Sequence, residues 1–153
     1  MTTLDEIDRR ILVELQRDAG QSLEALGAAV NLSRNACWRR VKHLESTGVI
    51  RKRVALLDPD KLDLKLSVFI QIRTRHHDAA WLAEFARAIE ATPEVTGAYR
   101  MSGDLDYLLH ARVADMAEYD ALYKRLTARI ELSDVSASFV MEEIKATTAL
   151  PVF

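Results

Sequence analysis

An amide, a guanidinium and an ammonium group recur at helical spacing in the first third of the chain. At 100° per residue, Asn35, Arg39 and Lys42 project from one side of a helix, and the apolar stripe that includes Val41 and Leu44 lies on the other side. Amide and guanidinium groups bond to adenine and guanine edges in a major groove, and lysine bonds to phosphate oxygens. The pattern predicts a DNA-binding helix, for which an ordinary solvated helix is the alternative.

The charge distribution favours the DNA-binding interpretation. Residues 33–53 hold seven Lys or Arg and one Glu, a local charge of +6, whereas the net charge of the chain is −2. Residues 1–53 hold ten cations and seven anions, and residues 54–153 hold eleven and sixteen. Such a concentration of cations attracts a polyanion. The residues that we expect to contact DNA are Ser33, Arg34, Asn35, Trp38, Arg39, Lys42, His43, Arg51, Lys52 and Arg53.

Two earlier helices are predicted to position the basic helix. Thr3 and Glu6 form a capping-box pattern that begins the first helix. The second helix contains Gly27, which is small enough for another element to approach closely. Asn31 tolerates the left-handed conformation of a sharp helix exit, and Ser33 is a good N-cap for the basic helix. This spacing predicts a helix-turn-helix.

The residues after the basic helix resemble a wing. Gly48 ends the helix, and a β-prone stretch with three consecutive cations follows it. We therefore predict a winged helix-turn-helix domain over residues 1–56. Residues 57–64 contain a Pro between two Asp and form the expected linker.

Residues 65–153 alternate between strand and helix patterns, which makes the whole chain an α+β protein. The order β-α-β-β-α-β predicts a ferredoxin-like domain, in which both helices cover one face of a four-stranded antiparallel sheet. Phe69, Leu108 and Val140 are expected on the other face, which predicts a symmetric homodimer with its two sheets face to face. The expected elements are strands over 64–73, 95–101, 107–113 and 135–143, and helices over 79–91 and 116–130.

Enzymatic and metal chemistry are poorly supported. No nucleophile, metal-ligand set or phosphate loop accompanies the acidic pairs Asp104/Asp106 and Glu142/Glu143. The run His76–Asp78 is interpreted as a solvated loop, because adjacent histidines rarely converge on one ion. Cys37, the single cysteine, is interpreted as a core residue in preference to a redox sensor. We expect no enzyme activity, no metal and no cofactor.

Composition places the chain among globular proteins. It has 153 residues, of which 49% are hydrophobic and 29% are charged. The sequence has neither a transmembrane run nor an evident signal peptide, so a cytoplasmic protein without a membrane partner is expected.

Four segments carry a resemblance to a known family. They are LDEIDRRILVELQRD, NLSRNACWRRVKHLESTGVIRK, SGDLDYLL and VMEEIKATTALP. Together they resemble the Lrp/AsnC, or feast/famine, transcriptional regulators from Leu4 almost to the end of the chain. The resemblance implies a regulator that binds double-stranded DNA as homodimers assembled into rings, often octamers. Asn31 stands where many relatives have Gly, which we interpret as neutral. Trp38 stands where many have a smaller or aliphatic residue, which could alter operator preference.

The resemblance also implies an amino acid effector, held between dimers, that changes oligomeric state or DNA binding. An apolar amino acid such as leucine would fit the similarity to leucine-responsive members. An effector-independent architectural DNA-binding protein is the alternative, in which residues 102–106 merely turn the chain. A ferredoxin-like ligand-binding or enzymatic domain is a third possibility, which the basic helix disfavours. The effector-contacting positions carried over from the family are Met101, Ser102, Gly103, Asp104, Asp106, Tyr107, Phe139, Val140 and Met141.

Overall fold

The computed structural model describes residues 3–76 and 78–153, so His77 of the expected solvated loop lies outside the described residues. The chain divides into two compact units, one formed by Met1–Leu56 with Lys145–Phe153 and the other by Leu57–Ile144. The first break falls where we expected the linker to begin. Within residues 57–64, Asp60–Leu62 form a short 3-10 helix. In the part of the chain that the structure describes, no helix is long and apolar enough to cross a membrane.

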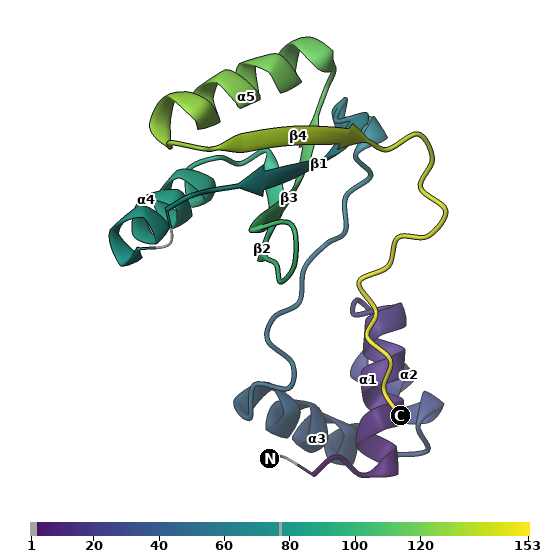
Figure 1. The fold of residues 1–153 in the computed structure, drawn as a ribbon. Helices are drawn as coiled ribbons and strands as arrows, with labels where there is room; N and C mark the ends of the chain where they lie inside the picture. Colours follow the sequence, from purple (N-terminus) through teal and green to yellow (C-terminus); the bar gives the residue numbers. More distant parts are fainter. Residues whose placement is uncertain (1–2, 77) are drawn as a thin grey trace. The chain divides into compact units, whose positions relative to one another are not determined.

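Three helices form the N-terminal unit, α1 (Glu6–Arg17), α2 (Leu23–Ala29) and α3 (Arg34–Ser46) (Figure 1). Ser33 caps α3 as predicted, since its hydroxyl accepts a hydrogen bond from the amide of Ala36. The predicted cap of α1 is wrong by two residues. Asp5, not Thr3, is the N-cap, and it exchanges capping-box hydrogen bonds with Asp8. The shift has a physical reason, because both carboxylates of this box also bind one guanidinium of α3.

The interior of this unit is a small apolar cluster contributed by all three helices. Burial raises the pKa of the Cys37 thiol, so the thiol stays protonated and behaves as a small hydrophobic group. The interpretation of Cys37 as a core residue is confirmed. The buried members of the cluster are Ile11, Leu26, Val30, Cys37, Val41 and Leu44.

The turn between α2 and α3 follows the sequence prediction closely. Asn31 has φ 59°, the left-handed conformation expected of it. The amide of Leu32 donates to the carbonyl of Gly27 at 2.8 Å. A Cβ atom at Gly27 would lie only 2.8 Å from the carbonyl oxygen of Leu32. The predicted close approach at Gly27 is therefore made by the backbone of the turn.

The expected β-structure of the wing is not formed. Gly48 has φ 76° and ends the helical region, and the amide of Ile50 donates to Leu44 O at 3.0 Å. Residues 51–57 then run without any strand assignment. A wing hairpin needs a second β-prone run as a partner, and Asp58-Pro59 interrupts the chain before one occurs.

The C-terminal tail packs with the N-terminal unit and not with the ferredoxin-like domain in which we placed it. Its anchor is a reciprocal pair of hydrogen bonds between Gln16 of α1 and the backbone of Leu150. The Gln16 amide nitrogen donates to Leu150 O at 3.0 Å, and Leu150 N donates to the Gln16 side-chain oxygen at 2.6 Å. These bonds satisfy tail backbone groups that lack a strand partner.

The second unit has the predicted ferredoxin-like order. Its sheet is antiparallel throughout, with the strand order β2-β3-β1-β4. The last strand ends at Phe139, four residues earlier than predicted. Val140 N donates to Ser67 O, and β1 begins at Leu66, so the chain beyond Val140 has no neighbouring strand. The elements are β1 (Leu66–Arg73), α4 (Ala79–Glu90), β2 (Val95–Arg100), β3 (Tyr107–Val113), α5 (Met116–Arg129) and β4 (Asp134–Phe139).

Alternation along the strands separates a covered face from an open face. Val68 and Leu109 point into the core and pack with residues of both helices, such as Phe85 and Leu122, so α4 and α5 cover one face as predicted. Phe69 and Leu108 occupy the intervening positions, and the Phe69 side chain is 37% exposed. Their predicted place on the open face is confirmed.

His110 is the polar centre of the open face. Its Nε2 atom lies 2.8 Å from Ser67 Oγ, its Nδ1 atom lies 3.1 Å from Thr96 Oγ1, and its ring stacks on Phe69. Burial lowers the pKa of His110, and the positive charge of Arg112 lowers it further. The neutral imidazole therefore links β1, β3 and β2.

Candidate DNA-binding surface and ligand-binding hairpin

The outer face of α3 presents the predicted DNA-contact side chains to solvent. Asn35, Trp38, Arg39, Lys42 and His43 are all exposed, whereas the stripe on the opposite side of the helix is buried. The sequence-derived helical wheel is thus correct. A helix with this division has one side packed on α1 and α2 and the other side available for a major groove.

Ion pairs divide the cations of this surface into two groups. Arg34 Nε lies 2.6 Å from Glu24 Oε1, so it bridges α2 and α3. Glu45 accepts from both Lys42 and Arg53, at 2.8 Å and 3.1 Å. The hydrogen bond from Lys42 lowers the pKa of Glu45, and Arg53 contributes to the same effect.

Arg39, Arg51 and Lys52 form the second group. Among residues 3–76 and 78–153, no carboxylate lies within ion-pairing distance of these three side chains. Their charges are not neutralised by a neighbour, so they are the cations of this unit that are best able to bind phosphate or guanine.

Arg40 is one of the seven cations of residues 33–53, but its role is structural. Its Nη1 atom lies 2.6 Å from Asp5 Oδ2 and 2.8 Å from Asp8 Oδ1. The pKa of Asp5 is lowered first by the amide of Asp8 and second by Arg40. Arg40 thereby joins the start of α1 to the middle of α3, a role that local sequence patterns did not reveal.

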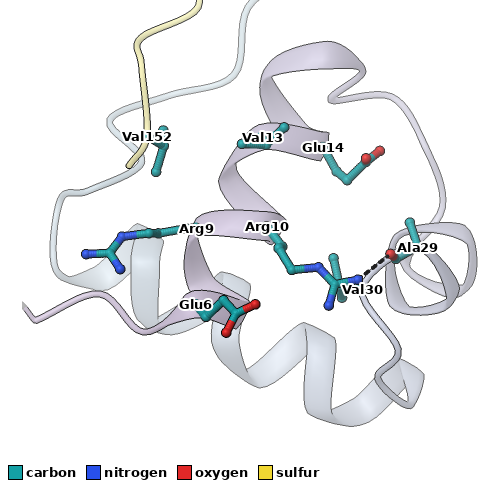
Figure 2. Close-up of a pocket in the computed structure, with 8 residues that line it drawn as sticks. All are labelled: Glu6, Arg9, Arg10, Val13, Glu14, Ala29, Val30 and Val152. Carbon is teal, nitrogen blue, oxygen red and sulfur yellow. Dashed lines mark hydrogen bonds between the residues drawn. The ribbon is translucent and has the colours of Figure 1, made fainter.

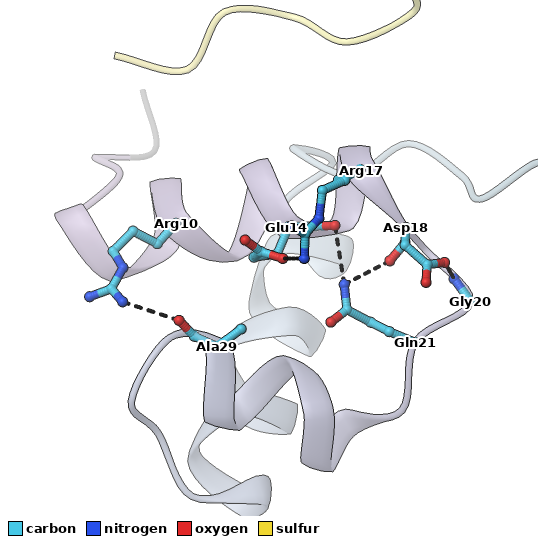
Figure 3. Close-up of polar contacts among 7 residues, drawn as sticks. All are labelled: Arg10, Glu14, Arg17, Asp18, Gly20, Gln21 and Ala29. Atoms are coloured by element: carbon cyan, nitrogen blue, oxygen red, sulfur yellow. Dashed lines mark hydrogen bonds and ion pairs between the residues drawn. The ribbon is translucent and has the colours of Figure 1, made fainter.

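Further polar contacts hold α1 against α2 and the preceding loop (Figure 3). Arg10 Nη2 donates to Ala29 O at 3.2 Å, at the end of α2. Gln21 Nε2 donates to Glu14 O at 3.1 Å and to Asp18 O at 2.8 Å. These bonds satisfy carbonyl groups at helix ends and in the connecting loop, and they keep the two helices that support α3 in place.

A shallow pocket of about 310 Å³ lies on the same unit (Figure 2). Basic and acidic side chains of α1 line it beside apolar ones, and Val152 of the tail also lines it. Because its charges are mixed, the pocket favours neither an anion nor a cation. Its lining residues are Glu6, Arg9, Arg10, Val13, Glu14, Ala29, Val30 and Val152.

The hairpin between β2 and β3 has an exposed backbone at Gly103 and is held to the end of β1 by hydrogen bonds. Gly103 has φ 106°, and a Cβ atom there would meet nothing within 4 Å. Asp106 Oδ2 accepts from Thr74 N at 2.8 Å, and Arg73 Nε donates to Asp104 O at 2.8 Å. The hairpin is therefore anchored at the end of β1. Arg73 and Thr74, which sequence reasoning missed, follow a predictable strand end, but their partners lie 31 and 32 residues further along the chain.

Two of the expected effector-contacting side chains lie elsewhere. The side chain of Tyr107 is buried in the core beside Trp81 and Phe85, with a ring-centroid distance of 4.5 Å to Phe85. Only its backbone remains near the hairpin. Phe139 also points to the helix-covered side, where its ring packs edge-on against Tyr119 at 5.0 Å.

The two sets of expected effector residues lie at opposite ends of the sheet. Asp106 N donates to Ile72 O, which places the hairpin at the end of β1. Phe139 pairs with Val68, near the start of β1, and Met141 beyond it is 96% exposed. One chain therefore does not bring residues 101–106 and 139–141 together. A site that uses both sets needs two chains.

The described residues contain no cluster of side chains that could bind a metal ion. Among residues 3–76 and 78–153, no group of three or more His, Cys, Asp or Glu side chains is arranged to hold an ion. His76 Nε2 lies 3.5 Å from Glu131 Oε2, in an exposed pair between the loop before α4 and the segment after α5.

Comparison with known proteins matches both units. The family model for the AsnC-type helix-turn-helix domain matches residues 4–45, and the model for the Lrp/AsnC ligand binding domain matches residues 67–150. The chain is 49% identical over 150 residues to the DNA-binding transcriptional activator DecR of Escherichia coli K12, with 97% of this chain and 99% of DecR covered.

Solved structures give the same result. A crystal structure of an AsnC family transcriptional regulator from Agrobacterium tumefaciens has a TM-score of 0.94 and 51% identity, with 97% of each chain covered. A Neisseria meningitidis transcriptional regulator in complex with L-Met has a TM-score of 0.93 and 36% identity, also with 97% of each chain covered. These relatives are transcriptional regulators and not enzymes. The chain therefore belongs to the Lrp/AsnC family of helix-turn-helix transcriptional regulators with a C-terminal ligand-binding domain.

Proposed function

We propose that this protein is a sequence-specific DNA-binding regulator whose DNA binding or oligomeric state responds to an amino acid held between protomers. The observation that carries the DNA-binding part is the exposed face of α3, where Asn35 and Arg39 lie beside Trp38 and where Arg39 has no ion pair among the described residues. Asn and Arg are the side chains that read adenine and guanine by paired hydrogen bonds.

Substitution of Arg39 and Lys42 by Ala tests this surface. We expect the double variant to lose operator binding, measured by fluorescence anisotropy on duplexes selected from a random pool by the wild-type protein. The matched control is Arg9→Ala with Arg17→Ala, which removes the same charge from exposed positions of α1. If both double variants bind equally well, α3 does not have the proposed role.

The hairpin supports an amino acid as effector. Exposed backbone around Gly103 can approach an α-carboxylate closely, and a carboxylate side chain can pair with an α-ammonium. Asp106 already accepts a backbone hydrogen bond from Thr74 through one oxygen. Asp104 has an exposed side chain, so we assign the ammonium contact to Asp104 first. The L-Met complex of the Neisseria meningitidis relative supports this ligand class.

A thermal-shift screen against the twenty amino acids tests the effector. A ligand of the folded state raises the melting temperature by mass action. We expect at least one amino acid to raise it for wild type, and Asp104→Asn to abolish that shift while retaining DNA binding. The control is Asp120→Asn, the same change at an exposed position of α5, outside both sets of expected effector residues. If DNA binding is intact and no amino acid shifts wild type, the architectural, effector-independent function is favoured.

The open sheet face supports a homodimer, and the family resemblance implies that dimers assemble further into rings such as octamers. Phe69 and Leu108 expose apolar surface around His110 on this face, and a second copy is the economical cover. Assembly of such dimers also offers a way for residues 101–106 and 139–141 of different chains to meet between dimers. Sedimentation of wild type beside Phe69→Glu tests the assembly, because a buried charge would prevent sheet-to-sheet packing. Unchanged sedimentation of the variant would place the interface elsewhere.

A further inference from the structure

We propose that Trp38 reads the 5-methyl group of thymine in the major groove. The inference rests on the proposed DNA-binding function and adds a base preference to it. Trp38 is 51% exposed on α3, although the residues around it on that face are polar or charged. An indole in this position gains little from the fold, because half of its surface stays in water.

The second tryptophan shows what an indole does when it serves the core. Trp81 is 8% exposed, its N–H donates to Glu131 O at 3.1 Å, and its ring stacks on Phe85 at 5.1 Å. Trp38 has none of these contacts among the described residues. The two environments differ in kind, which makes Trp38 a surface for recognition.

The position of Trp38 on the helix limits what it can touch. Asn35 and Arg39 lie four residues apart, which is about 6 Å along the helix axis, and Trp38 lies between them in the chain. Successive base pairs rise by about 3.4 Å. The indole therefore reaches the base pair that Asn35 reads or the next one.

The chemistry of the groove selects the ligand. The edges of base pairs in the major groove present donors, acceptors and a single apolar group, the C5 methyl of thymine. If Asn35 bonds to adenine, the thymine of the same pair carries that methyl. An apolar ring beside Asn35 thus fits an A·T step, whereas Arg39 fits guanine.

Deoxyuridine substitution tests this contact, because it removes the methyl group and leaves base pairing unchanged. Wild-type protein first selects duplexes from a random pool, and each thymine of the selected site is then replaced singly. We expect one position in each half-site at which the affinity of wild type falls about four-fold, the effect of burying one methyl-sized group. Trp38→Ala should be insensitive at that position, and Trp38→Phe should retain part of the effect.

Val13→Ala is the matched control, since it truncates a similarly exposed apolar side chain of the same unit, on α1 and outside the expected DNA contacts, and should keep the full methyl sensitivity. Equal sensitivity in wild type and Trp38→Ala would overturn the inference, as would the absence of a sensitive thymine. If Trp38→Ala lost affinity by the same factor for all duplexes, the inference would also be overturned, because a uniform loss indicates a phosphate contact. If wild type selects no sequence at all, the proposed function itself fails and the inference fails with it.

Fluorescence gives a second readout. Burial of the exposed indole against a base should move its emission to shorter wavelength when the selected duplex is added. Trp38→Phe leaves only the buried Trp81 and should show no such shift. A shift that persists in Trp38→Phe would assign the signal to the other domain and count against the contact.

Discussion

Replacement of Gly27 by Ala should destabilise the N-terminal unit, even though alanine is the better helix former. Gly27 is buried in α2. The added Cβ atom would lie 2.8 Å from Leu32 O and 3.6 Å from the carbonyl carbon of Ser33. Both are backbone atoms of the turn, so no side chain can rotate away to make room. The turn cannot move freely either, because Leu32 N donates to Gly27 O at 2.8 Å.

Two opposing effects decide whether Gly27→Ala raises or lowers the free energy of unfolding. Alanine in a helix interior is favoured over glycine by about 1 kcal/mol. Relief of the contact to a carbon–oxygen separation of about 3.3 Å requires a displacement of about 0.5 Å. An extra carbon forced into a packed region costs about 1–3 kcal/mol, and the weakened turn hydrogen bond adds about 1 kcal/mol. We expect a net loss of about 1–3 kcal/mol in the free energy of unfolding.

Urea denaturation measures this loss in a Trp81→Phe background, in which the emission of Trp38 alone reports on the N-terminal unit. Gly20→Ala is the matched control, because the Cβ atom added there meets only the flexible end of the Asp18 side chain, at 3.2 Å. The displaced turn precedes Ser33, the N-cap of α3, so Gly27→Ala should also weaken DNA binding. A Gly27→Ala protein as stable as wild type, or more stable, would refute the close approach as the reason for glycine.

Three further outcomes follow from individual contacts. His110→Gln should flatten the dependence of stability on pH. Because folding lowers the pKa of His110, its contribution to the free energy of unfolding is present above pH 6.5 and is lost as pH falls below that value. Thermal melts across this pH range would detect the difference between the variant and wild type. Gln16→Ala should release the tail at Leu150, with faster proteolysis of the C-terminus and little change in global melting. Asp106→Ala should lower the stability of the second unit by about 1 kcal/mol through the orphaned amide of Thr74, whereas Asp106→Asn should restore most of it.

Local patterns were sufficient to predict most of the fold. Periodicity alone separated the buried and exposed faces of α3, and alternation alone assigned Phe69 and Leu108 to the open face of the sheet. Asn31 was predicted to be left-handed from its residue type, and its φ of 59° agrees. These features depend on interactions within a few residues, which a sequence displays directly.

Features that depend on distant partners were missed or misplaced. The last strand was predicted too long because its end is set by where β1 begins and not by its own sequence. The tail at Leu150 has no periodic pattern, and its place depends on one glutamine 134 residues earlier. The hairpin residues were identified, but that Asp106 was already bonded to Thr74 could only be seen in three dimensions.

Contacts between residues that are distant in the sequence also reduce the number of cations that are free to bind DNA on the basic surface. Residues 33–53 contain seven cations. If each bound one phosphate, the logarithm of the DNA-binding constant would fall with the logarithm of the salt concentration with a slope of about −6 per protomer. In the structure, Arg40 is held by two carboxylates, and three more of these cations share Glu24 or Glu45. Of the three that lack such partners among the described residues, Arg39 is assigned to a base edge; if only Arg51 and Lys52 bind phosphate, the slope is about −2 per protomer. A surface with few phosphate contacts depends more on base edges for its affinity, which is the regime in which Asn35, Trp38 and Arg39 can determine where the protein binds.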